Sequence, residues 1–75
     1  MITYVAGIDI GNATTETALG KIENGRLVKC TSGITKTTGI KGTGENLYGM
    51  LNSLKEACSD MGISVSCLDL IRINE

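Results

Sequence analysis

The sequence predicts a small α/β domain, in which a three-stranded antiparallel meander is followed by one helix and then by a strand parallel to the first. Three patterns predict this order. Apolar residues alternate at period two near the amino terminus, an Asn-Gly pair separates two runs rich in β-branched residues, and a later stretch has apolar residues at three- and four-residue spacing. A chain of 75 residues is long enough for one domain at most.

The composition excludes several classes of protein. The net charge is -1, no basic run is present, and the aromatic residues are two tyrosines, so the chain lacks the positive patches and stacking platforms that nucleic-acid binding uses. The first ten residues carry no basic segment, and the apolar runs fall far short of the roughly 20 residues that a membrane span requires. We therefore expect a cytoplasmic protein that binds neither nucleic acid nor membrane.

The three cysteines, Cys30, Cys58 and Cys67, are odd in number and widely spaced, and the chain contains no histidine. This combination does not predict a disulfide framework or a zinc site. We interpret the cysteines as reduced thiols in a cytosolic setting, where a cysteine most often serves as a small apolar side chain.

The meander comprises three predicted strands. Residues 2–10 alternate in polarity and form a central strand, and "GNAT" supplies a tight turn into a second strand over 14–23. Asn24 and Gly25 then form the commonest two-residue hairpin signal, because both positions of a type I′ turn require positive φ. The third strand is predicted over 26–32.

A loop and a helix follow. Residues 33–44 contain four glycines and four threonines without a sustained period, which predicts a loop. Thr43 is the expected N-cap, Glu45 falls in the first turn, and Gly62 is placed as the C′ glycine. The expected apolar stripe is Leu47, Met50, Leu51, Leu54, Ala57, Cys58 and Met61. The expected polar face is Asn52, Ser53, Lys55, Glu56, Ser59 and Asp60.

The run "LDLIRI", residues 68–73, predicts a strand buried on both faces. A right-handed crossover would place it parallel to the first strand, with the helix on one face of the sheet. Within it, Arg72 is either a buried ion-pair partner or an exposed edge charge. The sequence stops at Asn74 and Glu75 with no closing helix, so we expect a domain that is cut short or that completes its sheet with another chain.

The turn after the first strand has the spacing D-x-G-x-x-x-T, met by Asp9, Gly11 and Thr15. Glycine lets the backbone approach a ligand closely, and successive turn N–H groups form a concavity that binds anions. The hydroxyls of Thr14 and Thr15 can donate to phosphate oxygens. Asp9 could hold Mg²⁺ through water, because this cation keeps several waters and takes few carboxylates.

A simpler interpretation is a hairpin turn capped by Asp9 and Asn12, with threonines present for β propensity. The surrounding strand, hairpin and crossover place the turn where such a motif requires it, which puts phosphate binding level with the simpler interpretation, and both stay open. In "TTGIKGTG", Lys41 could reach a phosphate or a carboxylate. That stretch lacks the residue order of a P-loop, so a flexible connector is the favoured interpretation.

Three segments, "AGIDIGNATTETAL", "TTGIKGTGENLYG" and "DLIRINE", together resemble the N-terminal segment of the large subunit of diol and glycerol dehydratase reactivases. These are chaperone-like ATPases of the actin, Hsp70 and sugar-kinase superfamily. The resemblance runs in matching order over essentially the whole chain, and "TTGIKGT" and "LIRINE" are more specific than "DIG". It implies a partial ribonuclease H-like (actin-like ATPase) fold, with residues 1–75 as a single N-terminal segment, a fragment, of that domain.

The resemblance also implies a function. Such a large subunit works with a small subunit and uses ATP and Mg²⁺ to release damaged cobalamin from inactivated adenosylcobalamin-dependent dehydratases. It implies no catalytic residue here. The first phosphate loop for ATP or ADP maps onto Asn12, Ala13 and Thr14, with Asp9, Gly11 and Thr15 around it. Ala13 stands where a serine is expected, which removes one hydroxyl contact but keeps the backbone N–H.

The family's second phosphate loop, adenosine pocket, second lobe and swivelling domain have no counterpart in the sequence. Ligand sites generally bury about 70–90 % of their ligand, so we expect weak nucleotide binding and no ATPase activity from this chain alone. Two alternatives stay open. One is a non-catalytic module whose exposed sheet edge pairs with a partner or with a second copy. The other is a lobe of a small-molecule kinase of the same superfamily, which would not share "LIRINE".

Overall fold

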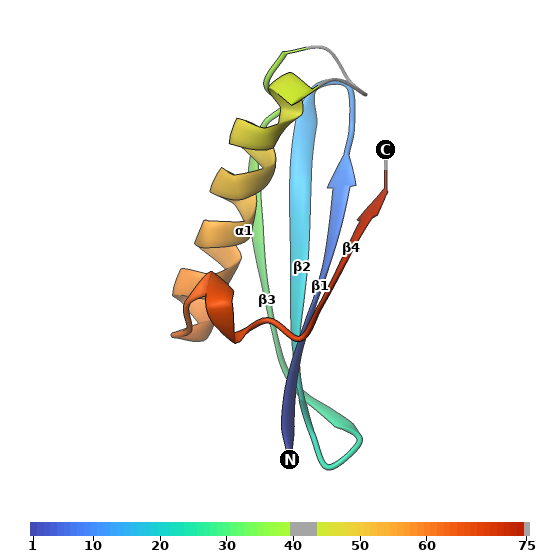
Figure 1. Cartoon of the computed structure of the whole chain (residues 1–75), viewed down its shortest axis with the longest axis vertical. Coiled ribbons are helices and arrows are strands. Elements are labelled where there is room, and N and C mark those ends of the chain that lie inside the picture. Colours follow the sequence, from blue (N-terminus) through green and yellow to red (C-terminus); the bar gives the residue numbers. More distant parts are fainter. Residues whose placement is uncertain (40–43, 75) are drawn as a thin grey trace.

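The computed structural model describes residues 1–39 and 44–74 and contains one four-stranded sheet with a helix on one face (Figure 1). The strand order is β3-β2-β1-β4, in which β1 pairs antiparallel with β2, β2 antiparallel with β3, and β1 parallel with β4. The predicted meander, helix and parallel strand are therefore confirmed. The strands are β1 (Ile2–Ile10), β2 (Thr14–Glu23), β3 (Arg26–Lys36) and β4 (Leu70–Asn74).

The hairpin between β2 and β3 turns at Asn24 and Gly25, whose φ angles of 52° and 82° confirm the predicted Asn-Gly turn. The prediction that a loop begins at residue 33 is wrong. Strand β3 continues to Lys36, which pairs with Thr14 of β2. The glycine that suggested a loop, Gly33, is buried where the helix crosses the strand, and the β-branched residues after it suit a strand.

Helix α1 (Leu47–Met61) follows a short 3₁₀ turn η1 (Gly44–Asn46), and Asn46 is its N-cap residue. Glu45 thus lies in η1 and not in the first turn of α1, which corrects the prediction, and the predicted N-cap Thr43 falls outside the described residues. The predicted C-terminal glycine is confirmed, since Gly62 adopts φ 81° in the left-handed region. Among the described residues, no helix has the length and apolar character to cross a membrane.

The face that α1 turns toward the sheet differs in part from the predicted stripe. Leu47 and Leu51 are 52 % and 42 % exposed, whereas Ser53, predicted to face solvent, is fully buried. The cause is a close approach of helix and sheet, since a Cβ added at Gly33 would lie 2.1 Å from the carbonyl oxygen of Ser53. Only small side chains fit there. The predicted stripe residues that are buried are Leu54, Ala57, Cys58 and Met61.

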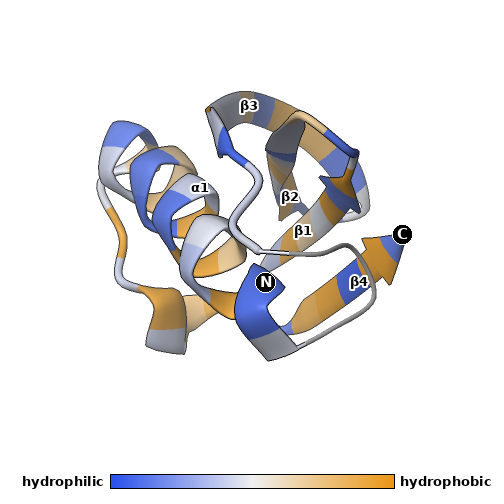
Figure 2. Ribbon diagram, turned by 90° about the horizontal axis from the view of Figure 1, so that it is seen from above, coloured by the Kyte–Doolittle hydropathy of each residue, from blue (hydrophilic) through white to orange (hydrophobic). Residues whose placement is uncertain are grey.

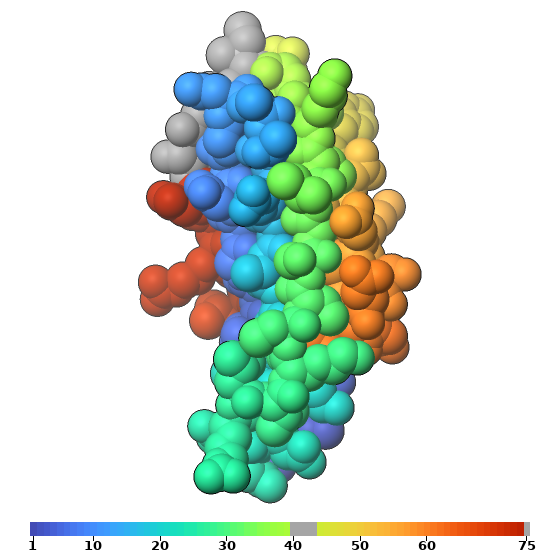
Figure 3. Space-filling view, turned by 180° about the vertical axis from the view of Figure 1, so that it is seen from behind, coloured from blue at the N-terminus to red at the C-terminus, as the bar shows by residue number. Residues whose placement is uncertain are grey.

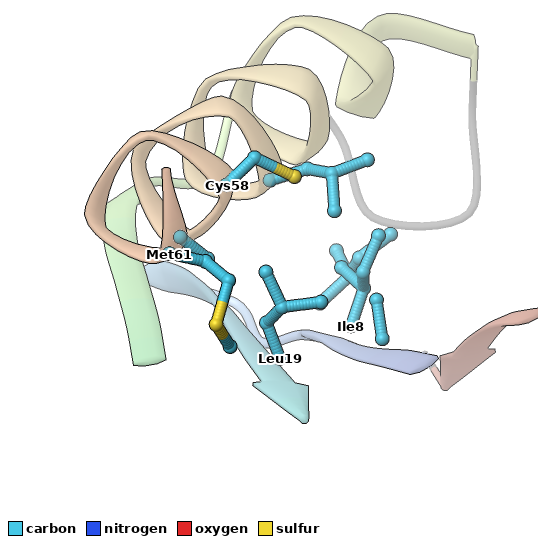
Figure 4. Close-up of a cluster of buried hydrophobic side chains, with 8 residues drawn as sticks. Ile8, Leu19, Cys58 and Met61 are labelled. Carbon is cyan, nitrogen blue, oxygen red and sulfur yellow. The ribbon is translucent and has the colours of Figure 1, made fainter. Parts of the chain in front are cut away.

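The hydrophobic core lies between α1 and the centre of the sheet. Ile8 and Leu19 rise from the strands to meet Cys58 and Met61 of the helix (Figure 4). Hydroxyl groups of the strands also bond to α1. Thr31 donates to the carbonyl oxygen of Ala57 at 2.7 Å. Thr35 donates to that of Gly49 at 2.9 Å, and Thr17 and Ser53 share a buried bond of 2.8 Å. A 3₁₀ turn η2 (Val65–Cys67) then leads away from the helix toward β4.

Strand β4 enters the sheet through a reciprocal pair of bonds. The Tyr4 N–H donates to Asp69 Oδ2 at 2.8 Å, and the Asp69 N–H donates to the Tyr4 carbonyl oxygen at 2.8 Å. The prediction that this strand is buried on both faces is wrong, since Leu70, Ile71 and Ile73 are 50 %, 42 % and 52 % exposed. It is the outer strand of the sheet, and α1 lies over β2 and β3, away from it (Figure 2).

Candidate functional site

The turn between β1 and β2 lies at the end of the sheet where α1 begins (Figure 1). Its ends are joined by a bond of 2.9 Å from the Gly11 N–H to the Thr14 carbonyl oxygen. A Cβ on Gly11 would lie 2.9 Å from that same oxygen, so the turn needs glycine at this position. Asn12, Ala13 and Thr14 are exposed to solvent.

Thr37, just beyond β3, holds the carbonyl groups of this turn. Its N–H donates to the Ala13 carbonyl oxygen at 3.0 Å, and its hydroxyl donates to the Gly11 carbonyl oxygen at 2.7 Å. Among the described residues, the backbone N–H groups of Asn12 and Ala13 find no acceptor. The carbonyl groups of Gly11, Ala13 and Thr14 are therefore occupied and two amide donors are available, a polarity that suits an anion.

Asp9 and Thr14 lie on the same side of the β1–β2 hairpin. Asp9 pairs with Glu16 across the strands, and Thr14 lies two residues before Glu16, so both project from the sheet face opposite α1. Such diagonal neighbours are about 7–8 Å apart. No cluster of three or more metal-ligating side chains occurs among the described residues. The exposed carboxylate of Asp9 is of the type that holds a hydrated Mg²⁺ through water.

Thr15 differs from the other predicted ligand residues. It is 0 % exposed on the face covered by α1, and its hydroxyl shares a bond of 2.9 Å with the hydroxyl of Thr37. The structure thus corrects the prediction that this hydroxyl is available to a phosphate, because the alternation of a strand that exposes Thr14 turns Thr15 inward.

The uncovered face of the sheet carries a shallow pocket of ≈ 740 Å³, on the side seen in Figure 3. Small residues Gly7 and Ala18 form part of its lining, with the charged side chains of Asp9, Glu16 and Arg72 around them. The turn residues 11–14 do not line it, so the structure does not bring Asp9 and the turn into one cavity. Arg72 is exposed on the outer strand, so it is an edge charge and not a buried ion-pair partner.

The sequence interpretation missed Thr37, and a signal for it existed. Thr31, Gly33, Thr35 and Thr37 recur at every second position, the period of a strand face. Treating the stretch as a loop concealed this pattern. The other residue singled out in this stretch, Lys41, lies outside the described residues.

The three cysteines are free thiols. Cys58 is buried in the core, where burial raises the pKa of its thiol above the usual value and nearby Cys67 raises it further. The interpretation as a small apolar side chain therefore fits Cys58. Cys30 and Cys67 are exposed, so the same interpretation is wrong for these two.

Comparison with known proteins identifies close relatives, although no protein-family model matches the chain. Over 73 residues, or 96 % of its length, the chain is 51 % identical to the propanediol dehydratase-reactivating factor large subunit of Citrobacter freundii. It is 49 % identical over the same span to the diol dehydratase-reactivating factor large subunit of Klebsiella michiganensis. The predicted resemblance to the reactivase large subunits is confirmed. The chain spans 12 % of the length of each of these reactivase subunits.

Solved reactivase structures match the fold as well. A glycerol dehydratase reactivase superimposes with a TM-score of 0.87 at 45 % identity, over 96 % of this chain and 12 % of the other. A diol dehydratase-reactivating factor in nucleotide-free form gives a TM-score of 0.89 at 46 % identity, over 97 % and 12 %. The mixed α/β arrangement described above is therefore also found in reactivases.

Proposed function

We propose that the chain forms the phosphate-binding half of an ATP or ADP site in a reactivating factor for adenosylcobalamin-dependent diol or glycerol dehydratase. The observation that carries this proposal is the β1–β2 turn, where Asn12 and Ala13 present exposed amide donors that no acceptor among the described residues takes up. Successive exposed N–H groups of this kind are what an anion-binding turn presents to its ligand.

The fold and its relatives support the same ligand class. We assign the order of meander, helix and parallel strand to a partial ribonuclease H-like fold of the actin-like ATPases, in which a first phosphate loop follows the first strand. One similar reactivase structure is described as a nucleotide-free form. A nucleotide is the ligand that we propose for the turn in this chain.

The residues of the turn have distinct roles in this proposal. The N–H groups of Asn12 and Ala13 and the hydroxyl of Thr14 bind phosphate oxygens, and Gly11 keeps the backbone close to the ligand. The exposed carboxylate of Asp9 holds Mg²⁺ through water. When bound, the cation neutralises part of the phosphate charge. We assign no catalytic role to the residues that the structure describes, so ATP hydrolysis needs further protein.

The partners follow from what the relatives are named for. They are large subunits of factors that reactivate dehydratases, and we propose that this chain serves such a factor, with a small subunit and a dehydratase as partners, in the cytoplasm. Its contribution is a chaperone-like one, because the factor acts on another folded enzyme and not on a small substrate.

Titration of the ¹⁵N-labelled chain with Mg-ATP, followed by amide resonances, tests the nucleotide proposal. We expect the resonances of Asn12 and Ala13 to shift at millimolar nucleotide. Asp9→Ala and Thr14→Val should each weaken the response, while the matched control Ser32→Ala, exposed on the same face but away from the turn, should not. Turn resonances that stay unchanged at saturating Mg-ATP would contradict the proposal.

A second candidate function has its own observation. The outer strand β4 exposes three large apolar side chains, Leu70, Ile71 and Ile73, beside an edge that no other strand of the described residues covers. Such an edge can pair with a strand of another chain. Sedimentation velocity tests this role: self-association that Ile73→Lys abolishes, with no change in the Mg-ATP response, would favour a binding module.

A further inference from the structure

We propose that Thr37 is a positioning residue for the phosphate-binding turn. A relay of hydroxyl groups from buried Thr15 through Thr37 orients the peptide unit that carries the Asn12 N–H. The inference rests on the proposed function, because it concerns the same turn, and it adds a residue on a different segment of the chain. It also gives the buried hydroxyl of Thr15 a role, although this hydroxyl cannot reach the ligand itself.

The relay has a defined direction. The Thr37 hydroxyl has one proton, and it donates that proton to the Gly11 carbonyl oxygen at 2.7 Å. In the bond of 2.9 Å between the hydroxyls of Thr15 and Thr37, Thr15 must therefore be the donor. Hydrogen bonds in such a chain strengthen one another. The relay runs from Thr15 to Thr37 to Gly11.

The geometry of the peptide bond links this relay to the ligand site. The carbonyl group of Gly11 and the N–H of Asn12 belong to one planar unit, and in a trans unit these groups point in opposite directions. Every peptide bond of the described residues is trans. Because Thr37 holds the carbonyl oxygen, the Asn12 N–H is fixed on the side away from Thr37, and the peptide unit cannot rotate the amide away from a ligand.

Thr37 is itself held in place by its neighbour Thr38, which contacts the beginning of the helix. The Thr38 hydroxyl donates to the Glu45 carbonyl oxygen and accepts from the Gly49 N–H at 3.1 Å. The Asn46 side-chain amide donates to the Thr38 carbonyl oxygen at 2.8 Å. The two threonines therefore connect the turn on one side with η1 and α1 on the other, and Thr37 is a fixed support for the turn.

The test compares three variants of the whole chain by Mg-ATP titration and by amide hydrogen exchange of Asn12. Thr37→Val removes the hydroxyl and keeps the backbone N–H that binds Ala13, and Thr37→Ser restores the hydroxyl. Thr35→Val is the matched control, because Thr35 is equally half-buried and donates to a backbone oxygen of the helix, at Gly49, and not to the turn.

We expect Thr37→Val to weaken Mg-ATP binding about three- to tenfold, the range that the loss of one hydrogen bond gives. It should also alter exchange at the Asn12 amide. Thr37→Ser should bind within about twofold of the wild type, and Thr35→Val should leave both measurements unchanged while losing similar stability. Thr15→Val, which removes the first donor of the relay, should weaken binding by a smaller factor, about twofold.

Equal binding by Thr37→Val and wild type would overturn the inference and leave the proposed function intact. Equal weakening by Thr35→Val would do the same, because the effect would then be general loss of stability. A wild-type chain that does not bind Mg-ATP would overturn both. Should Thr37→Val fail to fold, Thr15→Val decides, and unchanged Mg-ATP affinity in that variant would reject the relay.

Discussion

The two faces of the sheet differ in how they use neighbouring residues of the same strand. Along β2, Thr15, Thr17 and Leu19 are buried beneath α1, while the residues between them are exposed on the other face. The covered face holds the core and nearly every hydroxyl bond to the helix. The open face holds charged and small residues and the shallow pocket (Figure 3). Stability is thus concentrated on one face, and the other can change with little effect on the fold.

The largest contrast is expected for glycine substitutions on the two faces. Gly33→Ala would place a Cβ 2.1 Å from the Ser53 carbonyl oxygen on the covered face, and a backbone atom cannot move aside without displacing the helix. We expect a loss of about 3 kcal/mol or more in the free energy of unfolding. Gly7→Ala on the open face meets no atom within 4 Å and should raise stability by about 0.5 kcal/mol. Urea unfolding followed by circular dichroism measures the stability of both variants. Equal changes in the two would show that the two faces do not differ in this way.

The next largest effect is expected for the leucines of the helix. Leu54 is 3 % exposed in the core, so Leu54→Ala should lower the free energy of unfolding by about 2–4 kcal/mol. Leu51 lies about one turn earlier and is 42 % exposed, so Leu51→Ala should change the free energy of unfolding by less than about 1 kcal/mol. Thermal unfolding separates the two variants. A larger loss for Leu51→Ala would show that the helix packs in a different rotation.

A smaller effect is expected from the buried hydroxyl pair. Thr17→Val removes the bond to Ser53, but the Ser53 hydroxyl keeps its bond of 2.9 Å to the Met50 carbonyl oxygen. No buried polar group is left unpaired, so the loss should be about 1 kcal/mol. Thr14→Val, on the open face, should stay within about 0.5 kcal/mol of the wild type. Chemical unfolding measures the stability of both variants. If Thr17→Val lost more stability than Leu54→Ala, this account of the hydroxyl pair would be rejected.

The smallest effect concerns the pH dependence of stability. Burial and the nearby Cys67 raise the pKa of the Cys58 thiol in the folded chain, so the folded state disfavours the thiolate. The associated stability is complete below the unfolded thiol pKa of about 8.5 and is lost as the pH rises through the raised folded value. Cys58→Ala should remove this alkaline decline in melting temperature, and Cys30→Ala should keep it. In the wild type, Cys30 and Cys67 should react with a thiol reagent well before Cys58.

Local signals predicted the parts of the fold that depend on local chemistry. The period-two alternation of residues 2–10, the Asn-Gly pair and Gly62 each act through backbone angles or strand geometry, and each is confirmed. The errors arose where tertiary packing decides. Gly33 suggested a loop because glycine is unusual inside a strand. The glycine is needed there because α1 crosses the strand at Ser53, which lies 20 residues further along the chain.

The candidate site shows the same limit. Exposure of Asn12, Ala13 and Thr14 follows from their place in a turn, and the sequence predicted that turn correctly. The inward orientation of Thr15 also follows from strand alternation, but the motif placed it with the ligands. The period-two pattern of residues 31–37 could have placed Thr37 on the covered face of the strand, but not its contact with Gly11, which joins segments 26 residues apart.

The reciprocal bonds between Tyr4 and Asp69 join residues that are 65 positions apart. Because the meander and α1 are joined by shorter segments, we expect β4 to add to the sheet after they have formed. On a ribosome, which delivers the chain from its amino terminus, the outer edge of β1 stays unpaired until nearly the last of these 75 residues has emerged. During that interval the nascent sheet presents a bare strand edge, which is the kind of edge that pairs with other chains.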